Sequence, residues 1–457
     1  MEMAEREQFA SRIGFILITA GCAIGLGNVW RFPFIAGKYG GGAFVLLYLF
    51  FLVILGVPVM TMELSVGRAS KRSSVESFRR LEGEGSKWHL FGYPFIIGNY
   101  ILMMFYTTVT GWMLYYAWLH LRLLVTGATI ANAGDTFAAL TADPWTNFFF
   151  MALSVLLSFT VVAKGLQKGV ERITKGMMAG LFVLLLVLVV RILTLPGAGE
   201  GVLFYLKPDF SRMRAFAMDE VIFAAMGQAF FTLSIGMSAI AIFGSYIDRS
   251  HRLFGEALSI TALDTVVAFL AGLIVIPAAF AFDVPVGAGP SLIFVTLPEV
   301  FRAMDGGNLW GLFFFVFMSF AAFSTVIAVF ENITSFWIDA GKARKPVVRA
   351  NAAALIILAV PCILGFSLLS GFEPLGPGTN VLDLEDFIIS NNILPLGSIV
   401  YILFCTRKKS WGYEEFVEEV NAGKGAKLPK ALYPYYRYVM PLIILWIWAR
   451  GILVLFG

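Results

Sequence analysis

Five charged side chains lie inside otherwise apolar stretches of this sequence, and they are the first candidates for chemistry. They are Arg31, Glu63, Asp264, Glu331 and Asp386. Each charge costs about 2.5 kcal/mol or more inside a membrane span, so each needs a partner or a function. They form no HExxH motif and no close pair of carboxylates, so hydrolytic chemistry is not indicated. We interpret Glu63 first as a brace for broken backbone nearby.

Hydroxyl groups cluster in one apolar stretch, at Ser319, Ser324 and Thr325. Hydroxyls inside a helix commonly bond back to carbonyls of the preceding turn, which is the structural interpretation. The adjacent pair Ser324 and Thr325 would also suit a hard cation, which prefers oxygen ligands, beside unwound backbone. The three histidines are scattered and the three cysteines lie in or beside apolar runs. Neither a zinc site nor a disulfide framework is predicted.

The elements that must hold these side chains are membrane-spanning helices. Hydrophobic residues make up 59% of the 457-residue chain, charged residues 14%, and the mean hydropathy is +0.81. A soluble chain carries about 25% charged residues. The net charge of +4 is too small to indicate a nucleic-acid partner. The apolar runs predict an all-α integral membrane protein with about eleven transmembrane helices. They cover residues 13–37, 41–67, 90–124, 147–163, 176–195, 219–247, 257–283, 308–338, 347–369, 381–405 and 435–456.

Two of these runs break the helical pattern. The first contains GCAIGLGNVWRFP at 21–33, and the sixth contains GQAFFTLSIGMS at 227–238. A glycine costs about 1 kcal/mol relative to alanine inside a helix, so two glycine-rich segments need a reason. Close packing of helices is one reason, because Gly21 and Gly25 form a GxxxG pattern. Unwound backbone that binds ions and substrate near the middle of the membrane is the other. Breaks at corresponding positions of two five-helix halves favour the second.

The distribution of Lys and Arg predicts the orientation in the membrane. With the N-terminus in the cytoplasm, the inside segments hold 24 of these residues and the outside segments hold 7. The first twelve residues are polar and do not form a signal peptide. We therefore expect a multi-pass protein of the plasma or inner membrane. An odd number of spans would place the C-terminus outside.

The motifs as a group resemble the neurotransmitter:sodium symporters, and in particular their bacterial members that transport hydrophobic amino acids. The resemblance rests on AGCAIGLGNVWRFPFIAGKYGGGAF at 20–44, GVP at 56–58 with Glu63, GQAFFTLSIG, RILTLPGA at 191–198 and AAFST at 321–325. It implies the leucine-transporter-type fold, in which two five-helix repeats have inverted topology and helices 1 and 6 are unwound at mid-membrane. The implied division of the chain is a cytoplasmic segment at 1–12, a first repeat at 13–195, an extracellular loop at 196–218, a second repeat at 219–405, a cytoplasmic loop at 406–434 and an eleventh helix at 435–457.

The resemblance also implies two sodium sites and a substrate site. The first sodium ion would be bound by Ala23, Asn28, Thr232 and Asp264. The second would be bound by Gly21, Ile24, Ala321, Ser324 and Thr325. The substrate site would consist of Ala23, Gly25, Gly27, Leu102, Tyr106, Val109, Phe231, Thr232, Ser234, Met237 and Ser238.

Gly25 and Asp264 bear on the expected substrate class and on the expected chloride dependence. Amine transporters of this family have an aspartate at the position of Gly25, so glycine implies a substrate that brings its own carboxylate. The side-chain pocket has no charge, which implies hydrophobic L-amino acids such as Trp, Phe, Tyr and Leu. Chloride-dependent members have chloride ligands at the positions of Gln228 and Thr232, and a hydroxyl ligand where this chain has Ala268. We expect that the Asp264 carboxylate makes chloride unnecessary, and that it could take up a proton during the return step.

Two gates complete the implied transport cycle. The outer gate would use Arg31, Asp386, Tyr106 and Phe231, and the inner gate Arg6, Phe9, Tyr246 and Asp339. The expected function is sodium-coupled import by alternating access, without enzymatic activity. The expected partners are the amino acid and membrane lipid, and the resemblance also allows a homodimer. The alternatives are an amino-acid-gated ion channel and an amino acid sensor that does not transport.

Overall fold

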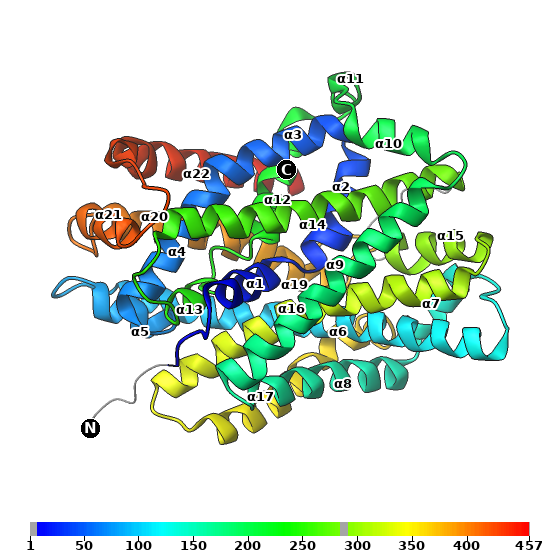
Figure 1. Ribbon diagram of the computed structural model, residues 1–457, viewed down its shortest axis with the longest axis horizontal. Coiled ribbons are helices and arrows are strands. Elements are labelled where there is room, and N and C mark those ends of the chain that lie inside the picture. The colour runs from blue at the N-terminus through cyan, green and yellow to red at the C-terminus, as the bar shows by residue number, and fades with distance from the viewer. Residues whose placement is uncertain (1–6, 284–290, 457) are drawn as a thin grey trace.

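The computed structural model describes residues 7–283 and 291–456, and the regular elements in those ranges are all helical (Figure 1). The first part of the chain forms α1 (Arg12–Ala23), η1 (Gly27–Arg31), α2 (Phe32–Lys38), α3 (Gly42–Phe51), η2 (Leu52–Gly56), α4 (Val57–Ser70), α5 (Ser74–Leu81), η3 (Trp88–Phe91), α6 (Gly92–Thr126), α7 (Ala133–Ala142), α8 (Pro144–Val162), η4 (Leu166–Glu171) and α9 (Arg172–Leu193). The middle part forms α10 (Ala198–Leu206), α11 (Phe210–Met213), α12 (Met218–Thr232), α13 (Ala241–Gly244), α14 (Leu253–Ala281), η5 (Leu292–Thr296), α15 (Leu297–Ala303) and α16 (Gly307–Asp339). The last part forms α17 (Arg344–Leu358), α18 (Val360–Leu364), α19 (Val381–Asp386), η6 (Phe387–Ile393), α20 (Leu394–Thr406), α21 (Tyr413–Asn421), η7 (Lys430–Leu432), η8 (Tyr435–Val439) and α22 (Met440–Phe456).

The spans follow the apolar runs closely. Among the described residues, nine helices are long and apolar enough to cross a membrane, and a bent pair makes a tenth. That pair joins α1 to η1 and α2 with a bend of 55°. The sixth predicted span is also broken, because α12 ends at Thr232 and α13 begins only at Ala241. α12 and α13 are each too short to span a membrane alone, so this broken span is not among the ten. Counting it gives the predicted eleven.

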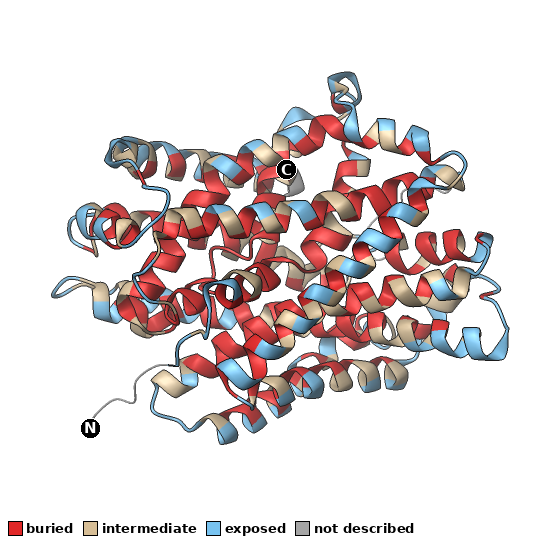
Figure 2. Cartoon of the chain, viewed as in Figure 1, coloured by how far each residue is buried: buried red, intermediate tan, exposed pale blue. Residues whose placement is uncertain are grey.

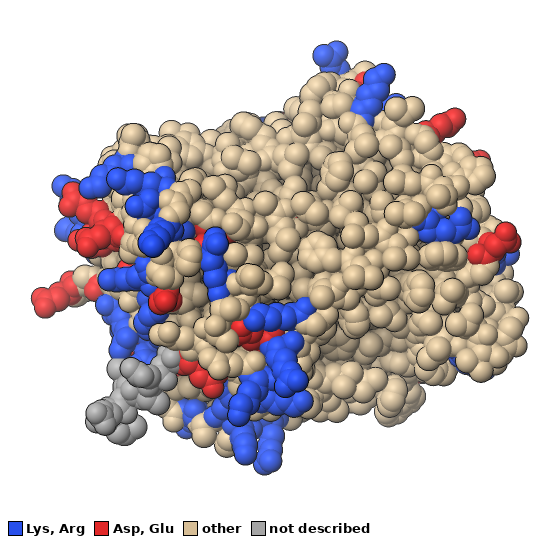
Figure 3. Space-filling model, viewed as in Figure 1, with Lys and Arg blue, Asp and Glu red and all other residues tan. Residues whose placement is uncertain are grey.

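Burial separates the central helices from the peripheral ones. In an apolar 18-residue stretch of each span, 78% of the residues are buried for the span that contains α16, against 33% for the span that begins at Leu166 and 28% for the last span. Figure 2 shows the buried residues concentrated along the inner helices. The visible face in Figure 3 has a broad uncharged band between charged regions at its two ends. An apolar band of this kind is what a helix bundle presents to lipid.

Proline explains most of the irregular turns within the spans. The part of the chain that the structure describes has six π-helical turns. Five of them, η1, η2, η5, η6 and η8, are each followed by a helix with proline at its second residue: Pro33, Pro58, Pro298, Pro395 and Pro441. Proline has no N–H group and clashes with the carbonyl four residues earlier, so the preceding turn widens. The exception is η4, which precedes α9 without a proline; Gly165 caps it and Gly169 lies within it.

Candidate functional site

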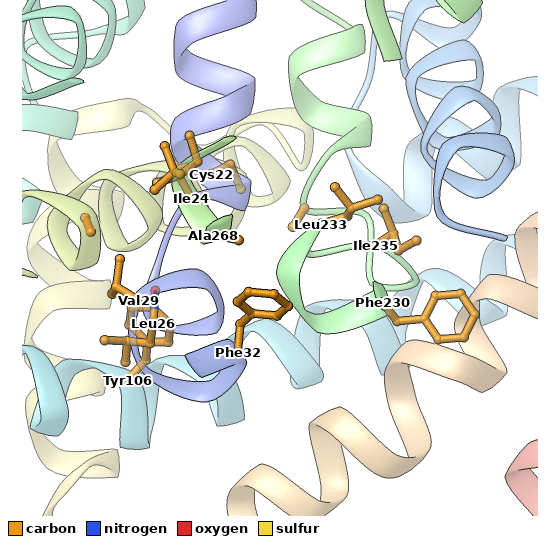
Figure 4. Close-up of a cluster of buried hydrophobic side chains, with 14 of the residues drawn as sticks. Cys22, Ile24, Leu26, Val29, Phe32, Tyr106, Phe230, Leu233, Ile235 and Ala268 are labelled. Carbon is orange, nitrogen blue, oxygen red and sulfur yellow. Dashed lines mark hydrogen bonds between the residues drawn. The ribbon is translucent and has the colours of Figure 1, made fainter. Parts of the chain in front are cut away.

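The two helix breaks lie side by side in the centre of the bundle. Figure 4 shows the segment after α1 (blue) next to the segment after α12 (green). The hydroxyl of Ser234 donates a hydrogen bond to the carbonyl of Cys22 across them (3.2 Å). Gly236, in the second break, has φ +94°, which favours glycine, and its amide donates to the Glu63 carboxylate. Glu63 therefore braces the broken backbone, as its sequence position suggested.

The first break is shaped by the absence of a side chain at Gly25. A Cβ atom at this position would overlap the hydroxyl oxygens of Tyr106 and Thr325, so no larger residue fits without displacement. The amide of Leu26 donates to the Tyr106 hydroxyl (2.9 Å). The backbone leaves helical geometry at Ile24, which has ψ 99°. The amide of Leu26 and the Tyr106 hydroxyl thus meet at the unwound backbone of the first break.

A first group of oxygen atoms surrounds Asp264 on α14. Asn28 Nδ2 donates to Asp264 Oδ1 (2.8 Å) and Thr232 Oγ1 donates to Asp264 Oδ2 (3.0 Å). The Asn28 amide oxygen accepts from the amide of Gly25 (3.0 Å). All three side chains are fully buried. The carboxylate and the hydroxyl could bind a small hard cation, and the Asn28 amide would add its oxygen only by turning over, because its Nδ2 faces Asp264.

A second group of oxygen atoms joins α16 to the end of α1. Ser324 Oγ lies 3.2 Å from the carbonyl oxygen of Ile24 and 2.8 Å from that of Ala321. Thr325 Oγ1 lies 3.4 Å from the carbonyl oxygen of Gly21 and 3.3 Å from that of Ile24. The five residues expected for the second sodium ion are therefore together in the fold. They supply three carbonyls and two hydroxyls without a formal charge.

A small cavity of about 10 Å³ lies between the two breaks. Its lining is mostly apolar and consists of Ala23, Gly27, Leu102, Tyr106, Phe231, Ser234, Met237, Thr325, Ile389 and Leu394. Sequence reasoning missed Ile389 and Leu394, which come from η6 and α20. The volume is close to that of one water molecule, so the lining side chains must move to admit an amino acid.

Four residues expected in the substrate site are not among those that line the cavity. Thr232 faces Asp264, Gly25 lies behind the Tyr106 hydroxyl, and Val109 is fully buried in α6. Ser238 is turned away, since its hydroxyl is 2.5 Å from that of Tyr401 and 3.4 Å from that of Ser74. Ser238 has φ 63°, and the unwound chain at this point does not follow helical periodicity.

One side of the cavity is covered by a cluster around Arg31. The Arg31 guanidinium lies 3.9 Å from the Asp386 carboxylate and 4.7 Å from the centre of the Phe231 ring. Ser390, which sequence reasoning missed, bridges this pair: it accepts from Arg31 (2.9 Å) and donates to Asp386 (2.6 Å). A vestibule of about 310 Å³ lies next to this cluster and includes Trp30 in its lining.

The other end of the bundle is closed by the N-terminal segment. Phe9 packs edge-on against Tyr246 (5.8 Å between ring centres), and its amide donates to the Tyr246 carbonyl (3.2 Å). The Tyr246 hydroxyl donates to Glu331 (2.8 Å), which also pairs with Arg344 (2.6 Å). Glu331 and its partner Arg344 therefore belong to the closure at this end of the bundle.

The expected pair between Arg6 and Asp339 cannot be followed, because Arg6 lies outside the described residues. Asp339 accepts hydrogen bonds from the Ser73 amide and hydroxyl, both 2.7 Å, and lies 3.4 Å from Arg72. Asp339 thus ties the end of α16 to the start of α5. Arg72 and Ser73 were not predicted, because their role depends on how α5 packs against α16.

Comparisons with known proteins identify one family of transporters and one fold that this chain resembles. Residues 6–132 and 145–455 match the family model described as the sodium:neurotransmitter symporter family. The chain is 35% identical over 446 residues to the sodium-dependent transporter YhdH of Bacillus subtilis, with 96% of each chain covered. It is 27% identical over 430 residues to the sodium-dependent serotonin transporter of Drosophila melanogaster, covering 82% of this chain and 68% of that one. The crystal structure of MhsT in complex with L-phenylalanine matches with a TM-score of 0.88 and 35% identity, covering 98% of this chain and 100% of that one.

The protein is therefore a secondary transporter rather than an enzyme, with several membrane-spanning helices. It belongs to the sodium:neurotransmitter symporter family, as the sequence motifs predicted. Its fold is the leucine-transporter type, which the likeness to MhsT confirms.

Proposed function

We propose that this protein is a symporter that imports hydrophobic L-amino acids with sodium and without chloride. The observation that carries the proposal is the break at Gly25, where backbone amides and the Tyr106 hydroxyl meet and no Cβ atom fits. Donors of this kind suit a carboxylate. The cavity continues into an apolar wall that includes Leu102, Phe231 and Met237, which suits an apolar side chain.

The ammonium group of the substrate would be received by carbonyl and hydroxyl oxygens of the second break. Ser234 lines the cavity, and its hydroxyl already donates to a carbonyl of the first break. An aromatic side chain would lie against Met237, whose flexible thioether adapts to rings of different size. MhsT, at 35% identity, was crystallised with L-phenylalanine, which supports the same substrate class for this chain.

Two sodium ions would be transported with the substrate. The group around Asp264 would bind the first ion through Asp264, Asn28, Thr232 and the carbonyl of Ala23, together with the substrate carboxylate. The group around Ser324 and Thr325 would bind the second. Because both groups include parts of the first break, binding of the ions would draw α1, α14 and α16 together. Sodium and substrate would therefore favour the same closed arrangement, which is the basis of coupling.

Chloride independence would follow from Asp264. Its carboxylate is fully buried and supplies a negative charge where a bound anion would otherwise offset the sodium charge. Gln228, at another position that the resemblance assigns to a chloride ligand, donates to the carbonyl of Gly27 (2.8 Å). Ala268 has no polar group to offer an anion.

Alternating access would use the two closures described above. On the outer side, the pair of Arg31 and Asp386 with Ser390 must separate to open a path from the vestibule. On the inner side, Phe9 must leave Tyr246. Exposed ion pairs contribute about 1 kcal/mol or less, so such contacts can open in every cycle. The N-terminus would lie in the cytoplasm and the C-terminus outside, following the excess of Lys and Arg.

Uptake of labelled phenylalanine into proteoliposomes tests the function. Concentrative uptake should require an inward sodium gradient and should disappear when choline replaces sodium. Equal uptake in both salts would contradict sodium coupling. Binding without accumulation would identify a sensor, and a sustained amino-acid-dependent current without accumulation would identify a channel.

A further inference from the structure

A groove of about 450 Å³ lies on the outside of the bundle where α9 begins, away from the transport site. Its residues form two groups, a cationic end and an apolar wall. Lys164, Lys168 and Arg172 form the cationic end, while Ile173, Gly176, Met177 and Phe320 form the wall. We name it the α9 groove.

The cationic end carries three exposed positive charges, and a carboxylate beside the groove, that of Glu7, is engaged by the Leu166 amide (2.7 Å). Lys164, Lys168 and Arg172 are exposed, and they make no ion pair within 4 Å with any described residue. No carboxylate is among the described residues that line the groove. The neighbouring Glu171 is buried and already engaged, since it pairs with Lys175 (2.6 Å) and accepts from the amide of Ala10 (3.0 Å). The three charges therefore suit an anionic ligand.

The cationic end lies at the edge of a membrane span. The span runs from Leu166 to Leu193 and exposes apolar side chains along its length. They include Val183 (62% exposed), Leu186 (53%) and Val190 (65%). Figure 3 shows Lys and Arg gathered at the lower left of the molecule, where α9 begins in Figure 1. A ligand bound here would meet cations at one end and a lipid-facing surface at the other.

A glycine forms the hollow between these two parts. A Cβ atom at Gly176 would meet nothing within 4 Å, so the groove is open there. One turn further, the Phe320 ring packs so closely on Gly180 that a Cβ atom would lie 2.9 Å from it. The Phe320 ring and the helix face at Gly176 and Gly180 thus form an apolar wall, which begins at the cationic end of the groove and follows α9.

We propose that the α9 groove binds an anionic phospholipid. The phosphate would lie against Lys164, Lys168 and Arg172, and an acyl chain would follow Gly176 and Phe320. Each Lys or Arg near a membrane surface strengthens attraction to anionic lipid severalfold, and here three act on one hollow. A free phosphate ion would use only the cationic end, whereas a phospholipid uses both parts.

Native mass spectrometry of the purified full-length protein tests the proposal. The protein is titrated with phosphatidylglycerol, or with phosphatidylcholine of the same acyl chains. Phosphatidylglycerol should bind at least about tenfold more tightly, because only its headgroup carries a net negative charge. Equal affinity for the two lipids would overturn the proposal. Displacement of the lipid by millimolar inorganic phosphate alone would also overturn it, because the site would then be one for a free anion.

Two variants locate the site. Replacement of Lys164, Lys168 and Arg172 by Gln should remove the preference for phosphatidylglycerol. The matched control replaces Arg407, Lys408 and Lys409, three exposed cations that follow α20, by Gln, and should keep the preference. Equal losses in both triple variants would overturn the proposal, because they would reflect total charge alone.

Gly176→Leu keeps every charge and fills the hollow. Leucine is also a better helix former than glycine, so this variant should fold even if the triple variant does not. It should weaken phosphatidylglycerol binding about tenfold. Unchanged binding in Gly176→Leu would overturn the placement of the acyl chain and with it the lipid assignment.

Discussion

Replacement of Asp264 by Asn gives the sharpest test of how this transporter would bind sodium. The substitution preserves the shape of a side chain that is fully buried and bonded to Asn28 (2.8 Å) and Thr232 (3.0 Å). It removes the formal charge from the first group of oxygen atoms. Two unit charges about 4 Å apart interact by about 4 kcal/mol at an effective dielectric constant of 20.

The amide oxygen of Asn would still be a ligand, so part of this energy is retained. We expect a net loss of about 2 to 3 kcal/mol, which corresponds to a rise of about 30- to 150-fold in the half-saturating sodium concentration. The assay is sodium-dependent phenylalanine uptake into proteoliposomes, with chloride replaced by gluconate. Wild-type uptake should be the same in both anions. Phenylalanine uptake by the Asp264→Asn variant should partly recover in chloride, because the anion can supply the missing negative charge.

Glu385→Gln is the matched control. Glu385 is another buried carboxyl group, 4% exposed, and it lies beside the Cys362 thiol, outside both groups of oxygen atoms. The same chemical change there should leave the sodium dependence unaltered. A wild-type sodium dependence of Asp264→Asn in gluconate would refute the role of Asp264. Collapse of wild-type uptake in gluconate would refute chloride independence.

Three further substitutions test the substrate site, the second ion site and the outer gate. Gly25→Ala should abolish phenylalanine binding in a scintillation proximity assay, because the added Cβ overlaps the Tyr106 hydroxyl; retained affinity would argue against this site. Thr325→Val removes a hydroxyl that contacts three carbonyls and should raise the half-saturating sodium concentration about five- to thirtyfold, whereas Thr325→Ser should stay near wild type. Ser390→Ala removes the bridge in the outer ion pair and should speed phenylalanine dissociation about two- to tenfold. An unchanged dissociation rate would separate Ser390 from the gate.

The sequence predicted the spans well because lipid imposes a simple rule. Each apolar run must satisfy its own backbone hydrogen bonds, so its length and composition indicate a helix. The break between Ala23 and Gly27 was predicted from glycine and polar residues at corresponding positions in two runs. The π-helical turns were not predicted, although the prolines that follow five of them gave a readable signal.

The structure brings residues of the expected site together where the backbone stays regular, and it separates them where tertiary packing decides their position. Ser324 and Thr325 lie on a continuous helix, and the structure brings them to the carbonyls of the first break. Ser238 lies in unwound chain, where a positive φ turns its side chain toward Tyr401. Ser390 and Leu394 reach the site through the approach of η6 and α20, which no local pattern encodes.

The central claim is that a hydrophobic amino acid and sodium move together through the paired breaks. Simultaneous measurement of labelled sodium and labelled phenylalanine entering the same proteoliposomes tests it most directly. We predict two sodium ions for each phenylalanine, with both fluxes abolished together by Gly25→Ala. Phenylalanine entry without sodium entry, or sodium entry that persists in Gly25→Ala, would contradict the account.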